Sequence, residues 1–172
     1  MENGRGPEAI RRKIVPLDEA ARLSAAARAS GKRIVFANGG FDILHVGHAR
    51  YLQGAKALGD FLIVGVNSDE SLRRLKGPGR PVQPEASRAL LVAAIAAVDL
   101  VVLFSDPDVT GLLRTLLPHV HCKGTDYTAE SVPERHVAEE IGAVVAIAGD
   151  PKDHATRDIL ARIRSAGKEP AK

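Results

Sequence analysis

Short apolar segments rich in β-branched residues alternate with helical segments along most of the chain. We expect strands over residues 33–37, 61–66, 100–104, 120–123 and 143–148. Helices are expected over residues 17–30, 48–58, 84–97, 108–117, 133–141 and 156–164. Strands that are apolar throughout are typical of a parallel sheet buried on both faces. The alternation therefore predicts an α/β fold, a single-domain doubly wound five-stranded parallel sheet of the Rossmann-like kind.

Composition limits the possible partners and compartments. The 172 residues are 45% hydrophobic, which is ordinary for one globular domain. A net charge of +3, 3% aromatic residues and no Trp argue against a nucleic-acid partner. The single cysteine, Cys122, excludes an internal disulfide framework. No apolar stretch is long enough for a bilayer and no signal peptide is recognisable, so we expect no membrane partner and a cytoplasmic location.

The two ends of the chain differ from the rest in composition. Residues 1–13 are mostly polar, and residues 167–172 read as a loose polar tail. Terminal segments of this kind are usually poorly ordered. We therefore expect a flexible N-terminus over 1–13, one folded domain over 14–166 and a flexible tail over 167–172.

The segment that follows the first predicted strand carries the strongest functional signal. It contains Asn38, Gly39, Gly40, Phe41, Asp42, His45, Gly47 and His48. Ligands of doubly wound sheets bind beyond the carboxyl ends of the strands, where this segment lies. His45 and His48 are three residues apart at the start of a helix, so both rings lie on one face, and the helix N-terminus favours an anion. Gly39 and Gly40 would let a ligand approach the backbone, and Gly47 leaves room for a phosphate chain.

The run Asn-Gly-Gly-Phe-Asp-Ile-Leu-His-Val-Gly-His resembles the signature of nucleotidyltransferases that carry a His-x-Gly-His motif. It is most similar to that of the bacterial heptose-1-phosphate adenylyltransferases, and the resemblance covers roughly residues 31–164. It implies the nucleotidyltransferase type of fold, here with an extra N-terminal helix over residues 17–30. It also implies transfer of AMP from ATP to a sugar phosphate. The favoured acceptor is D-glycero-D-manno-heptose 1-phosphate, which gives ADP-heptose and pyrophosphate.

The resemblance also implies a cofactor and an assembly. Mg²⁺ would be held by the phosphates of ATP and not by protein ligands. Members of the superfamily are commonly homodimers or higher homo-oligomers. We therefore expect ATP and a sugar phosphate as the small-molecule partners, and a second copy of the chain as the protein partner.

Further segments match the family after the other strands. The stretch Arg-Leu-Lys-Gly-Pro-Gly-Arg-Pro-Val contains Lys76, and Lys-Gly-Thr-Asp-Tyr resembles a Lys-Gly-Gly-Asp-Tyr loop that lines the nucleobase. By resemblance the catalytic residues are His45, His48 and Lys76. The nucleotide-binding residues are Asn38, Gly39, Gly40, Phe41, Gly47, Arg88, Lys123, Gly124, Asp126 and Thr156. The acceptor-binding residues are Asp42, Asn67 and Asp69.

Two departures from the family pattern concern the nucleotide side. Thr125 replaces the second glycine of the Lys-Gly-Gly-Asp-Tyr loop. Ala155 and Arg157 stand where the family usually has hydroxyl side chains in a Ser-Thr-Thr run, so Thr156 alone is retained. The hydroxyl contacts to the phosphate chain are therefore reduced, and Arg157 is a candidate replacement by charge.

The expected chemistry is an in-line attack of a sugar-phosphate oxygen on the α-phosphorus of ATP. No activated serine or cysteine nucleophile is evident, which suits a reaction that depends on positioning and charge stabilisation. Three alternatives stay open. They are a cytidylyltransferase acting on glycerol 3-phosphate or another phosphorylated alcohol, a non-catalytic nucleotide-binding module, and a zinc site that uses His45 and His48.

Overall fold

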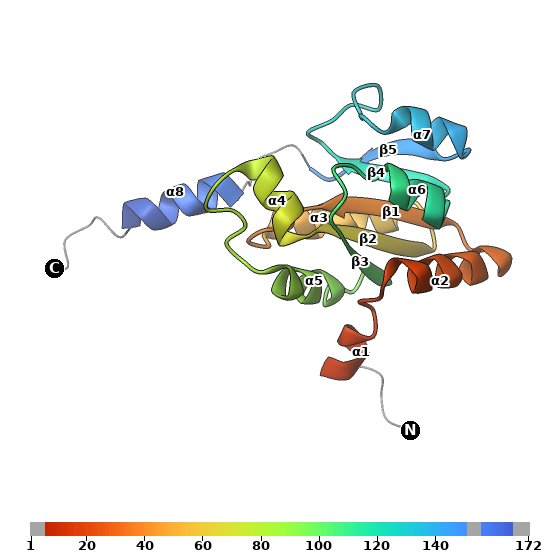
Figure 1. The fold of residues 1–172 in the computed structure, drawn as a ribbon, viewed down its shortest axis with the longest axis horizontal. Helices are drawn as coiled ribbons and strands as arrows, with labels where there is room; N and C mark the ends of the chain where they lie inside the picture. The colour runs from red at the N-terminus through yellow and green to blue at the C-terminus, as the bar shows by residue number, and fades with distance from the viewer. Residues whose placement is uncertain (1–5, 151–155, 167–172) are drawn as a thin grey trace.

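The computed structural model describes residues 6–150 and 156–166 (Figure 1). Its strands are β1 (Ile34–Gly39), β2 (Phe61–Asn67), β3 (Leu100–Phe104), β4 (Val120–Gly124) and β5 (Val144–Ala148). Its helices are α1 (Pro7–Arg11), α2 (Leu17–Ala29), α3 (Val46–Lys56), α4 (Asp69–Lys76), α5 (Glu85–Ala93), α6 (Thr110–Leu116), α7 (Arg135–Glu140) and α8 (Thr156–Ala166). Each predicted strand and helix is present within a few residues of its expected bounds.

The five strands form one parallel sheet in the order β3-β2-β1-β4-β5. The chain builds outward from β1 to β3 and then crosses back to β4 on the other side of β1. The boundary between β1 and β4 is therefore the point at which the strand order reverses, where ligands of such sheets bind. The predicted doubly wound fold is confirmed.

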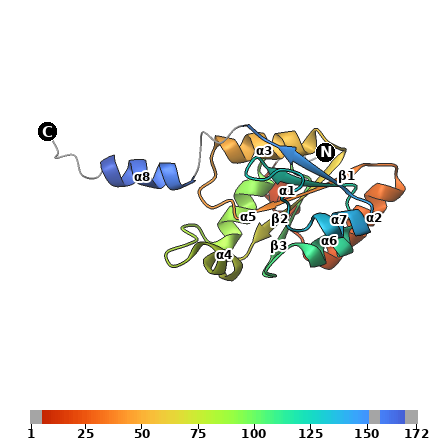
Figure 2. The ribbon, with the colours of Figure 1, turned by 90° about the horizontal axis from the view of Figure 1, so that it is seen from above.

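Helices cover both faces of the sheet, and each face has its own apolar core. Residues of α3 and α5 pack with one set of strand residues, including Val35 and Val64. Residues of α2, α6 and α7 pack with the alternate set, including Phe36 and Ile63. Figure 2 shows α3 on one side of the sheet and α6 and α7 on the other. Successive side chains along a strand point to opposite faces of the sheet. Alternate strand residues therefore pack against different helical layers.

Helix α4 begins and ends at residues with specific conformational preferences. The Ser68 hydroxyl accepts the backbone N–H of Ser71 at 3.1 Å, which is an N-terminal cap. The helix continues to Lys76 and stops at Gly77, whose φ of +85° favours glycine. Residues 73–76 of the basic segment therefore belong to α4, and the irregular part of that segment begins at Gly77.

The N-terminal segment is ordered further towards the N-terminus than we predicted. Helix α1 brings Ile10 against the core beside α5, and Ile14 packs there too. Val101 of β3 donates its N–H to the carbonyl of Lys13 at 2.8 Å, and Val15 donates to the carbonyl of Val101 at 3.0 Å. The segment thus covers the exposed edge of β3. The predicted flexible N-terminus is wrong for residues 7–13, and residues 167–172 lie outside the described residues.

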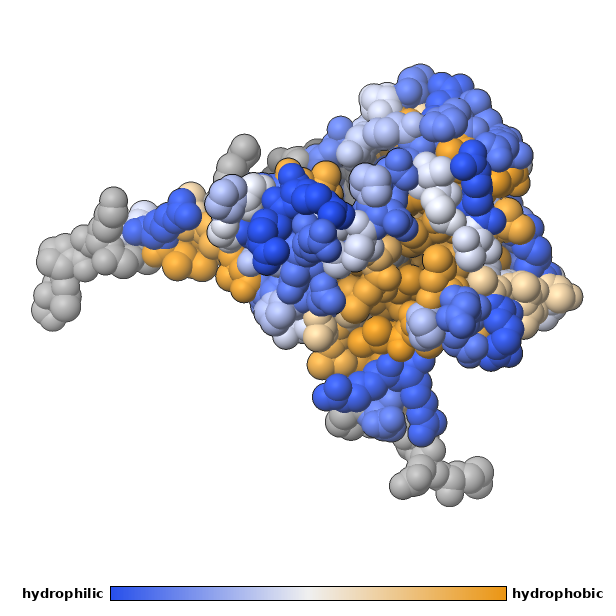
Figure 3. All heavy atoms as spheres, in the orientation of Figure 1, coloured by the Kyte–Doolittle hydropathy of each residue, from blue (hydrophilic) through white to orange (hydrophobic). Residues whose placement is uncertain are grey.

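Helix α8 extends away from the body of the molecule (Figures 1 and 2). An apolar stripe is visible along it in Figure 3, and Ile163 of this helix is 61% exposed. Hydrophilic atoms cover the neighbouring α4 in the same view. Across residues 6–150 and 156–166, no helix combines the length and apolar character needed to cross a lipid bilayer.

Candidate active site

A cavity of about 970 Å³ opens at the carboxyl ends of the strands. The structure brings most of the predicted site residues to its wall. They are Asn38, Gly39, Gly40, Phe41, Asp42, His45, Gly47, His48, Asn67, Lys76, Lys123, Gly124, Asp126 and Thr156. Arg88 and Asp69 are not part of this wall. Segments that are far apart in the sequence therefore meet at the carboxyl ends of the strands, as predicted.

The loop between β1 and α3 is held in an unusual backbone conformation. Phe41 and Ile43 have φ values of +48° and +56°, a region that residues with side chains rarely adopt. Such residues persist where the surroundings impose them, often at functional sites. A Cβ on Gly40 would lie 2.7 Å from Cδ1 of Leu72. Glycine at position 40 therefore leaves space for the Leu72 side chain. We had expected it only to leave space for a ligand.

The two motif histidines form a stacked pair at the N-terminus of α3. His45 is the N-cap residue, and the ring centroids of His45 and His48 are 3.8 Å apart. Phe41 contacts the His48 ring edge-on at 5.2 Å. The backbone N–H of His45 points to Nδ1 of His48 at 3.4 Å, which leaves Nε2 to carry the proton of the neutral ring.

Burial first, and then repulsion from His45, lowers the pKa of His48 to about 4. Its imidazole is thus neutral near pH 7 and donates through Nε2–H. A bound polyphosphate would raise this pKa, because a nearby negative charge favours the protonated ring. The pair is suited to donate hydrogen bonds to phosphate oxygens.

Asp42 is fully engaged with the loop that precedes α5. Its carboxylate accepts the backbone N–H groups of Val82 and Gln83 at 3.0 Å and pairs with Arg80 at 3.2 Å. The side chain is 4% exposed. Asp42 is therefore an anchor for this loop, and its role in binding the acceptor stays a prediction. Through this contact, Arg80 is held at the cavity wall.

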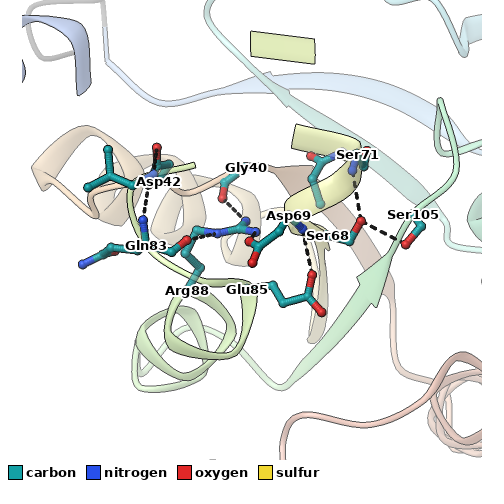
Figure 4. A network of polar contacts seen from close by, with 11 residues as sticks. Gly40, Asp42, Ser68, Asp69, Ser71, Gln83, Glu85, Arg88 and Ser105 are labelled. Carbon is teal, nitrogen blue, oxygen red and sulfur yellow. Dashed lines mark hydrogen bonds and ion pairs between the residues drawn. The ribbon is translucent and has the colours of Figure 1, made fainter. Parts of the chain in front are cut away.

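Arg88 is completely buried, whereas we expected it to reach a phosphate. Its guanidinium donates to the carbonyl of Gly40 at 2.6 Å, to the carbonyl of Gln83 at 2.9 Å and to Oδ1 of Asp69 at 2.7 Å. Figure 4 shows Arg88 lying between these three groups. In this structure the two side chains bind each other behind the β1–α3 loop, and the phosphate contact of Arg88 and the acceptor contact of Asp69 stay predictions.

Two of the remaining predicted residues make defined contacts with neighbouring segments. Asn67 ends β2, and its amide donates to the Ser71 hydroxyl at 3.0 Å. The Thr156 hydroxyl donates to the backbone carbonyl of Asp42 at 2.7 Å, which joins the start of α8 to the β1–α3 loop. The departures at Ala155 and in the side chain of Arg157 lie outside what the structure describes.

The β4 side of the cavity contains a buried ion pair. Lys123 Nζ lies 3.2 Å from Oε2 of Glu134, and their side chains are 7% and 8% exposed. The ammonium is also 5.4 Å from the centroid of the Tyr127 ring. Glu134 immediately precedes α7, and both members of the pair line the cavity. Lys123 thus faces a carboxylate. We had predicted a contact of Lys123 with the nucleotide and had not predicted this partner.

Several further residues line the cavity that we did not predict from the sequence. They are Arg50, Arg80, Phe104, Asp108, Glu134, Asp150, Leu160 and Arg164. Arg80 belongs to the basic segment that resembles the family, so that segment could have identified it as a site residue. Glu134 had no such signal, because its partner Lys123 is distant in sequence and the pair forms only through the packing of α7.

His45 and His48, on which the zinc alternative rests, lie together, but a zinc site needs further ligands, and His119, His121 and Cys122 do not join them. His119 Nδ1 accepts the N–H of Ile34 at 2.9 Å, while His121 and Cys122 point to opposite faces of β4. Within the described ranges, no group of three or more His, Cys, Asp or Glu side chains is placed to hold a metal ion. The donors at the cavity wall suit phosphate oxygens better than a metal.

Known proteins share both the sequence and the fold of this chain. The cytidylyltransferase-like family model matches residues 36–165. The bifunctional protein HldE of Geotalea uraniireducens is 46% identical over 153 residues, which are 89% of this chain and 31% of that protein. The HldE protein of Geobacter sulfurreducens is 44% identical over 154 residues, 90% of this chain and 31% of that protein. The chain thus spans less than a third of these curated relatives.

A solved structure has the same fold. It is that of a lipopolysaccharide core biosynthesis protein from Thermoplasma volcanium, with a TM-score of 0.57 and 34% sequence identity. The match covers 68% of this chain and 94% of that one.

Proposed function

Because this chain belongs to the cytidylyltransferase-like family, we propose that it is a nucleotidyltransferase that moves AMP from ATP to a sugar 1-phosphate. D-glycero-D-manno-heptose 1-phosphate is the proposed acceptor, and ADP-heptose and pyrophosphate are the products. Identities of 44–46% to HldE proteins over about nine-tenths of this chain support the adenylyltransferase assignment. Similarity to the lipopolysaccharide core biosynthesis protein of Thermoplasma volcanium supports a surface-sugar precursor as product.

The stacked pair of His45 and His48 is the observation that carries the mechanism. The pair lies at the N-terminus of α3 beside the β1–β4 reversal, where a triphosphate would meet both the ring donors and the helix N–H groups. An acceptor phosphate oxygen attacks the α-phosphorus in line, forming the new P–O bond while the bond to the β-phosphate oxygen breaks. The electron pair leaves with pyrophosphate.

Charge on the leaving group is the main quantity that the protein has to stabilise. The Nε2–H group of His48 donates to the pyrophosphate as its negative charge grows. Lys76, at the end of α4, and Arg80, held by Asp42, supply positive charge at the cavity wall. The attacking phosphate is already ionised, so no strong general base is required. Mg²⁺ would enter with ATP and neutralise its phosphates, since the described wall residues do not form a metal site of their own.

Pyrophosphate release tests the proposal. ATP and CTP are each paired with heptose 1-phosphate and with glycerol 3-phosphate, in the presence of Mg²⁺. Release with ATP and heptose 1-phosphate alone is the expected result. Release with CTP and glycerol 3-phosphate would assign the cytidylyltransferase alternative. Binding of ATP without release in any pair would identify a nucleotide-binding module.

A further inference from the structure

The carboxyl ends of four neighbouring strands present side chains to the layer formed by α6 and α7. Phe36 and Ile63 belong to the core beneath this layer, so Asn38 and Asn67, an even number of residues further on, face the same way. Phe104 belongs to that core directly. Lys123 follows on the same face, since His121 contacts the Phe36 ring. This layer lies on the side of the sheet opposite to α3 and its histidines.

Polar atoms on this face have unused hydrogen-bonding capacity. Oδ1 of Asn38 is buried and accepts no hydrogen bond from the described residues. Oε2 of Glu134 is buried and, apart from its ion-pair contact with Lys123, has no hydrogen-bond partner there. Buried polar atoms are almost always partnered, and a buried ion pair needs further hydrogen bonds to offset its desolvation. Buried acceptor atoms without a hydrogen-bond partner at a cavity wall therefore point to a polar ligand.

The chemistry of this group favours a neutral polyol. An ammonium donates only, a carboxylate accepts only, and a hydroxyl does both. Neighbouring hydroxyls of a sugar can accept from Lys123 and donate to Glu134. A cationic acceptor would be repelled by Lys123, and a second anionic group by Glu134. Phe104 and Val109 supply apolar wall for the C–H face of a ring.

We infer that the Lys123–Glu134 pair is a specificity determinant that binds the hydroxyl groups of the acceptor sugar. The inference rests on the proposed function, because it assigns the α6 and α7 side of the cavity to the acceptor. The α3 side is left to the nucleotide, where Gly47, Gly149 and Thr156 line the wall. Lys123 thus belongs to the acceptor, in place of the nucleotide role implied by resemblance.

Steady-state kinetics of three variants test the inference. Glu134→Gln and Lys123→Met each remove one charged hydrogen-bonding partner, so we expect kcat/KM for heptose 1-phosphate to fall by about 10–100-fold. The KM for ATP stays within twofold. Glu140→Gln is the matched control, since Glu140 is the last residue of α7 and pairs with Arg114 at the exposed surface. It should leave both constants unchanged.

A double variant separates ligand binding from folding. Lys123→Met with Glu134→Leu replaces a buried ion pair by apolar side chains, a change that often preserves or raises stability. We expect its Tm to match or exceed that of the wild type while heptose 1-phosphate affinity stays lost. If the double variant regains both the Tm and the kcat/KM for heptose 1-phosphate of the wild type, the pair has a structural role only and the inference is overturned. A change in the KM for ATP alone would overturn it too.

Calorimetry keeps the inference separate from the proposed reaction. Heptose 1-phosphate is titrated into wild type and Glu134→Gln in the presence of a non-hydrolysable ATP analogue. Weaker binding to the variant supports the inference even if the wild type releases no pyrophosphate. Equal binding, or no binding to the wild type, overturns it, whatever the outcome of the turnover assay.

Discussion

Arg88 and Lys123 are both buried cations that face a carboxylate beside the cavity, but their surroundings differ. Arg88 donates to Asp69 and to two backbone carbonyls, and the whole cluster is satisfied by the protein (Figure 4). Lys123 contacts Glu134 and the Tyr127 ring, and buried acceptor atoms on the same face have no donor among the described residues. A saturated cluster stabilises the scaffold, whereas an unsaturated one at a cavity wall is available for a ligand.

The largest expected effect comes from breaking the saturated cluster. Arg88→Met removes the guanidinium that donates to the Asp69 carboxylate and to the Gly40 carbonyl, and the Asp69 carboxylate is left without this partner. We expect a loss of about 3–5 kcal/mol in the free energy of unfolding, measured by urea denaturation. Arg114→Met, which opens an exposed and solvent-screened pair with Glu140, should change the free energy of unfolding far less. Equal losses in the two variants would break the comparison between buried and exposed cations.

The histidine pair at the start of α3 should affect turnover more than folding. His48→Ala removes the Nε2–H donor, so we expect kcat to fall by about 10²–10³-fold with Tm nearly unchanged. His136→Ala, on the exposed surface of α7, is the control. A kcat reduction below about fivefold would remove His48 from the mechanism.

A pH series sharpens the comparison on the β4 side. Neither ring nitrogen of His121 has a hydrogen-bond partner among the described residues, and burial, followed by the charge of Lys123, lowers its pKa to about 3. The unfolded chain therefore takes up this proton near pH 6.5 while the folded chain does not, so stability falls as pH drops from 6.5 toward 3.

His121→Leu should lack this dependence. Relative to wild type, its free energy of unfolding should gain up to about 1.4 kcal/mol per pH unit below pH 6.5. Urea denaturation at pH 7 and at pH 4.5 measures the difference. Parallel pH profiles for the two proteins would show that His121 is solvated or hydrogen-bonded in the folded state.

The smallest effect lies at the edge of the saturated cluster. The Ser68 hydroxyl caps α4 and accepts from the Ser105 hydroxyl at 2.9 Å. Ser68→Ala should lower the free energy of unfolding by about 1 kcal/mol, as for other N-terminal caps. Ser165→Ala removes a hydroxyl that donates to the backbone of its own helix, at Arg162, and should change little. Hydrogen exchange across α4 would locate any loss.

Much of the fold was predictable because strand burial leaves a strong local pattern. The apolar strands and their alternation with helical segments placed the five strands and the long helices within a few residues of their observed bounds. The motif around His45 and His48 placed the start of α3 and the histidine pair at the cavity wall, since the motif is one contiguous segment. The N-terminal segment that covers the edge of β3 was not predicted, because residues 7–13 look polar and Ile10 supplies their contact with the core.

The sequence by itself determined the strand–helix alternation, the end of the sheet at which the cavity opens and the histidine pair. These depend on local periodicity and on spacing within a few residues. Only the tertiary structure decided that Arg88 is buried against Asp69, that Asp42 anchors the loop holding Arg80, and that Lys123 faces Glu134. The physical reason is that a charged side chain looks alike in sequence whether it meets water, a ligand or another charge. Its partner is chosen by packing between segments that are distant along the chain.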